Sequence, residues 1–188
     1  MFAERGVSAT LNDVARAAGV GVGTVYRKFA DKDAVLDALF DGKVEALVDL
    51  ADEASAIDDA GVAIRTLLLG VMAKRASDRG LDVILTASGR TDRFTQQLGV
   101  KFLPKVDRLI ARAVEAGELR EGFTAPEVCM LGFMVGKVAD ITGVENPGAW
   151  RRYAQLLIDG TRLAAATTTL SPSPLPFPEI AAALARSN

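Results

Sequence analysis

The apolar residues of this chain recur every three or four positions over almost its whole length, and no segment alternates convincingly as a strand. The clearest apolar stripe runs from Asp31 to about Ala54, with acidic residues at its start, where the helix dipole favours negative charge. Further helices are expected at about 60–76, 82–87, 94–116, 126–142 and 149–166. Pro104 falls inside one of these stripes, so we expect a kink there or two shorter helices. The sequence therefore predicts an all-α fold.

The composition argues against several functions. The 188 residues include no histidine and a single cysteine, Cys129, which excludes histidine-based catalysis, an intrachain disulfide and a cysteine-rich zinc site. No catalytic constellation is recognisable, so the chain is predicted not to be an enzyme and to need no cofactor or metal. The longest uncharged apolar stretch is about half of a roughly 20-residue membrane span, and no export signal is recognisable. We therefore expect a cytoplasmic protein with no membrane partner.

The segment from Thr10 to Phe29 has the pattern of a helix-turn-helix. Thr10 and Asp13 form the start signal of a capping box, in which each side chain satisfies a backbone amide. Gly19 tolerates the positive φ of a sharp turn, and the small side chain of Ala15 lets the second helix cross the first closely. An ordinary helical hairpin within a bundle is the alternative interpretation of this pattern.

The second helix of this segment is expected to bury Val25 and Phe29 and to expose a small, basic, hydroxyl-bearing face that suits a major groove. Lys32, at the start of the next helix, could hold a phosphate. The net charge of the chain is −2, but from Arg16 to Lys32 four basic residues and one acidic residue give a local charge of +3. Because salt screens distant charges, this local patch is what a DNA phosphate would meet.

The run from Asp13 to Phe29, DVARAAGVGVGTVYRKF, continued by DKDAVL from Asp31, resembles the DNA-binding domain of the TetR family of bacterial transcriptional regulators. The resemblance covers residues 1 to about 50 and is specific in residue type and spacing. It implies an all-helical homodimer, usually a repressor, that releases a palindromic operator when a small molecule binds the C-terminal domain. It also implies DNA contacts by eight residues: Thr10, Val22, Gly23, Thr24, Tyr26, Arg27, Lys28 and Lys32.

The sequence departs from the family pattern at two places. Gly21 stands where the family commonly has Ser, so the recognition helix lacks a hydroxyl cap. Met1 and Phe2 look like the end of a first helix that family members carry in full. We expect the native gene to encode a further amphipathic, basic segment upstream.

The chain divides into three expected regions: a helix-turn-helix DNA-binding domain at 1–50, a ligand-binding and dimerisation domain at 51–166, and a Pro-rich tail with a possible short helix at 167–188. Long side chains in the second region could line a pocket for a small apolar effector, although each also suits an ordinary core. The pocket candidates are Phe94, Phe102, Met130, Phe133, Met134 and Trp150.

Small residues recur at three- or four-residue spacing along the helix expected at 126–142 and form a groove. A glycine inside a helix costs about 1 kcal/mol, so we expect another backbone to pack closely here. The partner is either a helix of the same subunit or the equivalent helix of a twofold mate, and the resemblance favours the mate. The predicted dimer interface is Cys129, Gly132, Gly136, Ala139, Gly143 and, on the last large helix, Gly160.

These features support two hypotheses of different class. The first is a ligand-responsive dimeric transcriptional regulator, probed through its affinity for operator DNA. The second is a helical small-molecule-binding module that no longer binds DNA. Sequence-dependent DNA binding that weakens steeply with salt distinguishes the first from the second.

Overall fold

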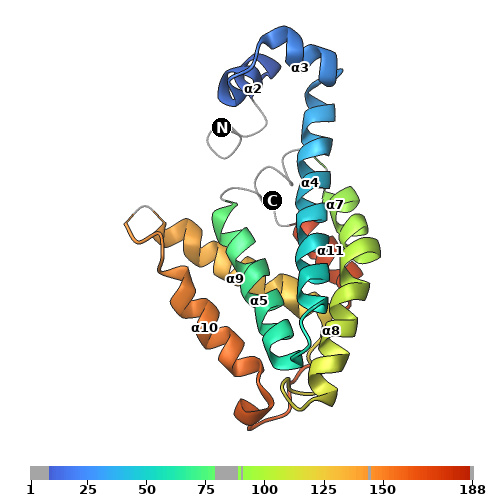
Figure 1. The fold of residues 1–188 in the computed structure, drawn as a ribbon, viewed down its shortest axis with the longest axis vertical. Helices are drawn as coiled ribbons and strands as arrows, with labels where there is room; N and C mark the ends of the chain where they lie inside the picture. Colours follow the sequence, from blue (N-terminus) through green and yellow to red (C-terminus); the bar gives the residue numbers. More distant parts are fainter. Residues whose placement is uncertain (1–8, 79–88, 90, 144, 187–188) are drawn as a thin grey trace.

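The computed structural model describes residues 9–78, 89, 91–143 and 145–186. Helices and short connections make up this part of the chain, and no β-strand occurs in it, so the predicted all-α fold is confirmed. Figure 1 shows a small helical unit, α2 and α3, at one end of the long helix α4, with the other helices packed around the opposite part of α4. The predicted helix at 82–87 and the expectation for Met1 and Phe2 lie outside the described residues.

The bounds of the helices agree closely with most of the expected ranges. The elements are α2 (Leu11–Ala18), α3 (Val22–Lys28), α4 (Lys32–Ser55), α5 (Ala60–Ser77), α7 (Thr91–Gln97), the π-helix η2 (Leu98–Phe102), α8 (Leu103–Glu115), α9 (Ala125–Thr142), α10 (Trp150–Thr161), the 3-10 helix η3 (Leu163–Ala165) and α11 (Phe177–Arg186). The last large helix, α10, ends before the expected 166.

The buried apolar residues form a small cluster and a large one. The small cluster holds α2 against α3 and the start of α4, and consists of Leu11, Ala15, Val25 and Val35. The large cluster begins one residue later on α4, at Leu36, and extends through the helices from α5 to α10. Helix α4 therefore belongs to both clusters, and the boundary expected at residue 50 falls inside a continuous helix.

Close packing of α5 against α9 explains the small residues on α9. A Cβ atom on Gly136 would lie 2.7 Å from Cγ of Arg75, and one on Gly132 would lie 3.2 Å from Cγ1 of Val71. Both glycines are buried. The groove therefore receives α5 of the same chain, which is one of the two partners that the sequence left open.

The helix expected at 94–116 is interrupted, as the position of Pro104 predicts. Between α7 and α8 lies η2, whose end is closed by the amide of Leu103 donating to the carbonyl of Leu98. Pro104 then occupies the first turn of α8, where its missing N–H costs no intrahelical hydrogen bond. The interruption has the form of a π-helical turn, a form that the sequence did not specify.

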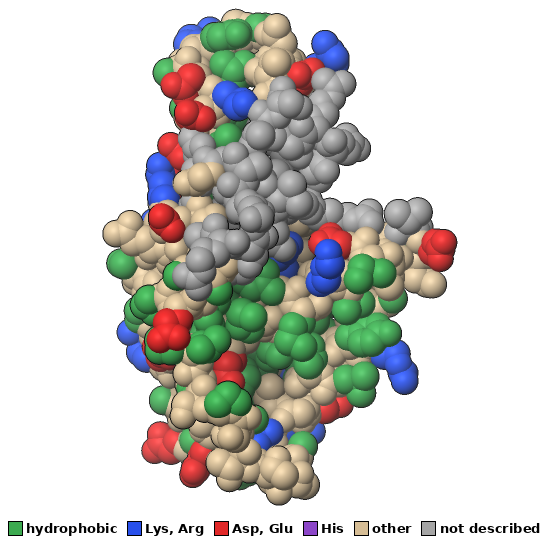
Figure 2. Space-filling view, turned by 180° about the vertical axis from the view of Figure 1, so that it is seen from behind, with side chains coloured by type: hydrophobic (Ala, Val, Ile, Leu, Met, Phe, Trp, Pro, Cys, Tyr) green, Lys and Arg blue, Asp and Glu red, His purple; other side chains and the backbone are tan. Residues whose placement is uncertain are grey.

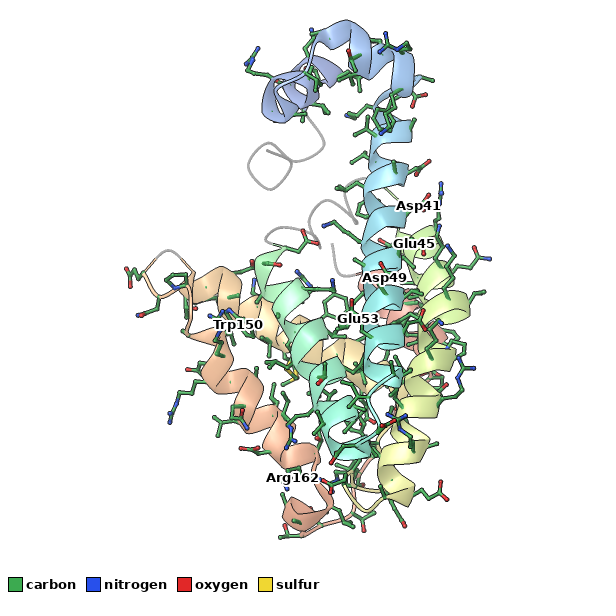
Figure 3. All side chains as sticks on the ribbon, viewed as in Figure 1. Asp41, Glu45, Asp49, Glu53, Trp150 and Arg162 are labelled. Atoms are coloured by element: carbon green, nitrogen blue, oxygen red, sulfur yellow. The ribbon has the colours of Figure 1, made fainter. Side chains whose placement is uncertain are left out.

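A row of polar contacts joins α4 to the α7–η2–α8 arm. The guanidinium of Arg93 lies 2.9 Å from the carboxylates of both Asp37 and Asp41. Further along α4, Lys101 pairs with Glu45. Asp41 and Glu45, labelled in Figure 3, lie on the side of α4 that faces this arm. Exposed pairs of this kind contribute at most about 1 kcal/mol each, so the row fixes alignment more than stability.

The C-terminal tail contains the short helix that the sequence left as a possibility. Helix α11 packs against α7, with Ile180 buried and the ring of Phe177 half-buried beside Gly99. The Pro-rich stretch before it is mainly exposed. The tail is therefore anchored to the larger cluster through its last helix.

Candidate functional site

The start of α2 is capped as the sequence predicts. The amide of Asp13 donates to Oγ1 of Thr10 at 3.2 Å, and the amide of Thr10 donates to the Asp13 carboxylate at 3.0 Å. Two amides that the first turn would leave unpaired are thereby satisfied. The capping box places Thr10 exposed at the start of α2.

The turn between α2 and α3 depends on Gly19. This residue has φ 67°, in the left-handed region, and its amide donates to the carbonyl of Arg16 at 3.3 Å. The next amide, of Val20, donates to the carbonyl of Ala15 at 3.0 Å. These bonds end α2 and turn the chain sharply, while the buried Ala15 allows the two helices to approach.

Helix α3 exposes the face that the sequence assigned to DNA. Val25, the anchor on its inner side, is only 5% exposed, whereas Val22 and Tyr26 are 43% and 55% exposed. The remaining predicted contact residues of α3 are exposed as well: Gly23, Thr24, Arg27 and Lys28. A buried valine and an exposed tyrosine at adjacent positions show that this helix is anchored on one side only.

The flanks of this face are also close to their expected state. Phe29 is half-buried rather than fully buried, and the ammonium of Lys28 lies 5.6 Å from the centre of its ring. Lys32 is half-buried in the first turn of α4, next to Asp31, which accepts a 2.8 Å hydrogen bond from the amide of Ala34. We call the exposed residues of α3 together with Thr10 and Lys32 the reading surface.

A second candidate site is a partly open cavity of about 350 Å³, lined by residues of α4, α5, α7, η2 and α9 and by Asp78. Of the six pocket candidates, Phe94, Phe102 and Phe133 lie on its wall. Met130 and Met134 instead lie exposed on the outer side of α9. Trp150 is buried at the start of α10, where the guanidinium of Arg151 covers its ring at 4.7 Å. Figure 3 labels Trp150 and Arg162 near the two ends of α10.

One end of this cavity is polar, a feature that the sequence pattern did not predict. Lys43 of α4 forms an ion pair with Asp78, the residue after α5. The guanidinium of Arg75 donates to the carbonyl of Asp78 at 3.1 Å and lies 5.3 Å from the ring centre of Phe133. Lys74 lines the same end. The signal in the sequence was the run of charged residues that closes α5, but nothing local connects it with Lys43.

Cys129 also lines the cavity, and burial raises the pKa of its thiol from 9.0 to about 12. The thiol therefore stays protonated at neutral pH, and a protonated thiol is neither a strong nucleophile nor a metal ligand. Within the described residues no three acidic, cysteine or histidine side chains are placed to hold a metal ion. The helices of that same part are also too short or too polar to cross a membrane.

The residues predicted for the dimer interface occupy two different environments. Gly132, Gly136 and Ala139 are buried inside the subunit and are not accessible to a second one, because α5 covers the α9 groove. Gly160 lies exposed on α10, with open space around it. The other two residues, Cys129 and Gly143, are half-buried.

Exposed apolar side chains on α9 and α10 form a different surface, which we call the apolar face. It consists of Met130, Met134, Ile141, Tyr153 and Leu156, and Gly160 continues it along α10. Figure 2 shows hydrophobic side chains gathered over this part of the molecule. Apolar patches of this kind on a soluble domain mark interaction surfaces.

A helix-turn-helix with an exposed second helix, joined by one long helix to a larger helical domain that contains a cavity, is the architecture of a DNA-binding transcriptional regulator. Residues 1–39 match the family model of bacterial regulatory proteins of the tetR family, and residues 59–163 match that of the Transcriptional regulator SbtR-like, C-terminal domain. The chain belongs to the TetR family of transcriptional regulators.

Solved structures support the same fold. The fatty acid degradation regulator FadR from Bacillus halodurans is 22% identical with a TM-score of 0.59, covering 85% of this chain and 89% of that one. The TetR transcriptional regulator SCO0520 from Streptomyces coelicolor is 23% identical with a TM-score of 0.60, covering 86% and 91%. The ketosteroid transcriptional regulator KstR2 of Mycobacterium tuberculosis is 20% identical with a TM-score of 0.53, covering 86% and 89%. A search of curated proteins gave no match.

Proposed function

We propose that this chain is a ligand-responsive repressor: a cytoplasmic, non-enzymatic homodimer that binds a palindromic operator and leaves it when an effector occupies the cavity of the larger domain. The observation that carries this proposal is the one-sided anchoring of α3, with Val25 buried and Tyr26 exposed. A helix that exposes one aromatic and two cationic side chains on one face is suited to binding in a major groove.

Each residue of the reading surface has a role that its chemistry supports. Arg27 can form two hydrogen bonds to one guanine, which makes it the candidate for base recognition. Thr24 and Tyr26 carry hydroxyls that donate to phosphate oxygens, and Lys28 supplies charge. Lys32, in the first turn of α4, adds an ammonium beside a helix start that already favours anions.

The dimer is proposed to form through the apolar face. On α9 its side chains stand four and seven residues apart; on α10 Tyr153 and Leu156 stand three apart and Gly160 follows four residues later, so each helix presents one stripe. When the stripes of two subunits meet across a twofold axis, each stripe covers the other, and the apolar area is removed from solvent. A twofold dimer presents two α3 helices, and operator half-sites then lie about 34 Å apart, one helical turn of DNA.

DNA binding is tested with the purified chain and a pool of random-sequence duplexes, enriched by repeated selection. The selected duplex should bind with an affinity that falls steeply as salt rises, because phosphate contacts release counterions. Arg27→Ala should weaken binding by about 1–3 kcal/mol and relax the preferred base at one position in each half-site. Arg108→Ala, which removes an exposed arginine of α8 remote from the reading surface, is the matched control and should bind normally.

The alternative is a small-molecule-binding module without DNA affinity. It would be favoured if the selection enriched no sequence and if the amount of DNA retained by the protein did not depend on salt. Equal losses for Arg27→Ala and Arg108→Ala would show that binding depends on overall charge and would refute the assigned role of α3.

The dimer is tested by light scattering. Met134→Asp and Leu156→Asp place a charge at positions that are 51% and 59% exposed in the isolated chain, so they should yield a folded monomer. Val100→Asp changes an exposed apolar residue of η2 outside the apolar face and should leave the dimer mass unchanged. Dimer masses for all three proteins would exclude the apolar face as the subunit interface.

A further inference from the structure

We propose that the cavity of the larger domain binds an anionic amphiphile, a carboxylate joined to an apolar or aromatic body. The inference names the ligand class of the repressor proposed above, and only its consequence at DNA rests on that function. Binding itself is argued from the residues that line the cavity.

The residues that line most of the cavity indicate a ligand with an apolar body. Three aromatic residues from three different helical elements, Phe94, Phe102 and Phe133, line the cavity together with Leu47 and Val71. Its volume of about 350 Å³ is near the lower end of the range for small-molecule sites. At about 30 Å³ for each water-sized group, it has room for about a dozen non-hydrogen atoms.

The anionic head is indicated by the polar end. Among the described residues that line the cavity, three carry a positive charge, Lys43, Lys74 and Arg75, and one carries a negative charge, Asp78. Lys43 and Arg75 come from different helices; Lys43 contacts the carboxylate of Asp78 and Arg75 its backbone carbonyl, so both cationic groups lie beside the same residue.

This proximity distinguishes the cluster from a set of solvated surface charges. The side chain of Lys43 is 24% exposed and that of Asp78 is 29% exposed, so the pair is largely removed from water. The plane of the Arg75 guanidinium is held over the ring of Phe133, which orients its N–H groups. A carboxylate that enters here gains charge-assisted hydrogen bonds in a site of reduced dielectric, whereas an ammonium meets a net positive charge.

Occupation of this end has a consequence for α4. The ion pair of Lys43 with Asp78 ties α4 to the end of α5, and a ligand carboxylate competes with Asp78 for the same ammonium. The contacts of Arg93 hold α4 to α7 on its other side and are not affected. Ligand binding therefore changes the polar contact between α4 and the end of α5, on a helix whose first turns carry the helix-turn-helix.

The test uses three probes that share one body and differ in the charge of the head: 4-phenylbutyrate, 4-phenyl-1-butanol and 4-phenylbutylamine. Each is titrated calorimetrically into the full chain without DNA. We expect 4-phenylbutyrate to bind at least about tenfold more tightly than the amine, with the alcohol between them. Equal affinities across the series, or binding of none of the three, would overturn the inference.

Two matched variants test where the carboxylate of the ligand binds. Lys43→Gln should weaken the binding of 4-phenylbutyrate by about tenfold, because one charged hydrogen bond is lost. Lys101→Gln also removes a lysine that pairs with a carboxylate of α4, but Lys101 does not line the cavity, so this variant should bind normally. Equal affinities for the two variants would place the head elsewhere and contradict the proposal.

Charge reversal supplies a readout that a purely structural role of Lys43 would not give. Lys43→Glu should invert the order of the probes, so that the amine binds more tightly than 4-phenylbutyrate, and circular dichroism verifies that the variant is folded. An unchanged order in a folded variant would overturn the inference. The DNA experiment is separate: if 4-phenylbutyrate binds as expected but leaves DNA affinity unchanged, the cavity inference stands and the repressor proposal fails.

Discussion

The same substitution, glycine to serine, should have opposite effects at two positions only two residues apart. Gly21 is the N-cap of α3, with φ −65° and ψ 141°, a conformation that any residue adopts. No side chain caps α3, and a Cβ on Gly21 would meet only Oγ1 of Thr24, at an ordinary 3.9 Å. At Gly19, φ is 67°, where a side chain is strained even though the space around it is open.

The structure sets the size of both effects. Ser at position 21 can accept a hydrogen bond from the amide of Thr24, which is worth a few tenths of a kcal/mol relative to glycine. This difference is a net change in stability and already includes the restricted unfolded chain. We therefore expect Gly21→Ser to stabilise α3 by about 0.3–0.5 kcal/mol. Gly19→Ser should cost about 1 kcal/mol, because the left-handed conformation penalises a side chain by roughly 1–2 kcal/mol and only part is offset by the unfolded chain.

Native-state hydrogen exchange of the α3 amides measures these changes locally. The amide of Phe29, which donates to the carbonyl of Val25 at 2.8 Å, reports the opening of the last turn. Its exchange should slow about twofold in Gly21→Ser and accelerate about fivefold in Gly19→Ser. Changes of the same sign in both variants would refute the assignment of the cap and the left-handed turn to these two glycines.

Three further results are expected, each with its own measurement. Phe102→Ala, which removes a fully buried ring from the large cluster, should lower the free energy of unfolding in urea by about 3–5 kcal/mol, and a loss below about 1 kcal/mol would contradict this packing. Gly136→Leu should lower the free energy of unfolding by about 1–3 kcal/mol, because the new side chain presses on Arg75. Light scattering should still give the mass of the proposed dimer. A folded monomer would instead indicate that the α9 groove is a subunit interface. The raised pKa of the Cys129 thiol stabilises the folded chain below pH 9.0, and this contribution is lost between pH 9.0 and about 12. The stability of the wild type relative to Cys129→Ala should therefore fall by roughly 1 kcal/mol from pH 8 to pH 10, and a constant difference would show that the thiol is not desolvated.

The features that the sequence predicted correctly are those fixed by neighbouring residues. The capping box needs only Thr10 and Asp13, and the turn needs only a glycine at position 19 after a helical pattern. The interruption near Pro104 follows from the missing amide of one residue. Each of these determinants acts within about one turn of helix, so its physical effect is visible in the chain itself.

The features that the sequence missed depend on which face of a helix meets which partner. Helix α9 is apolar around most of its circumference, since one side meets α5 while Met130 and Met134 form an exposed stripe on the other. Periodicity therefore could not separate pocket, core and surface on this helix. Small residues such as Gly136 indicate that another backbone is close, but not which one. The pairing of Lys43 with Asp78 joins residues 35 positions apart and depends on the packing of α4 beside α5.

Because α4 is long, a small rotation about one of its ends produces a large displacement of the other end. Its 24 residues make a rod about 36 Å long, with one end held in the cluster around Val35 and the other among Leu50, Ala51 and Ala54. Pivoting such a rod by about 5° at its far end displaces the near end by about 3 Å, close to the rise of one base pair. In the proposed dimer, a pivot of this size at α4 would displace each α3 by about one base pair along its groove.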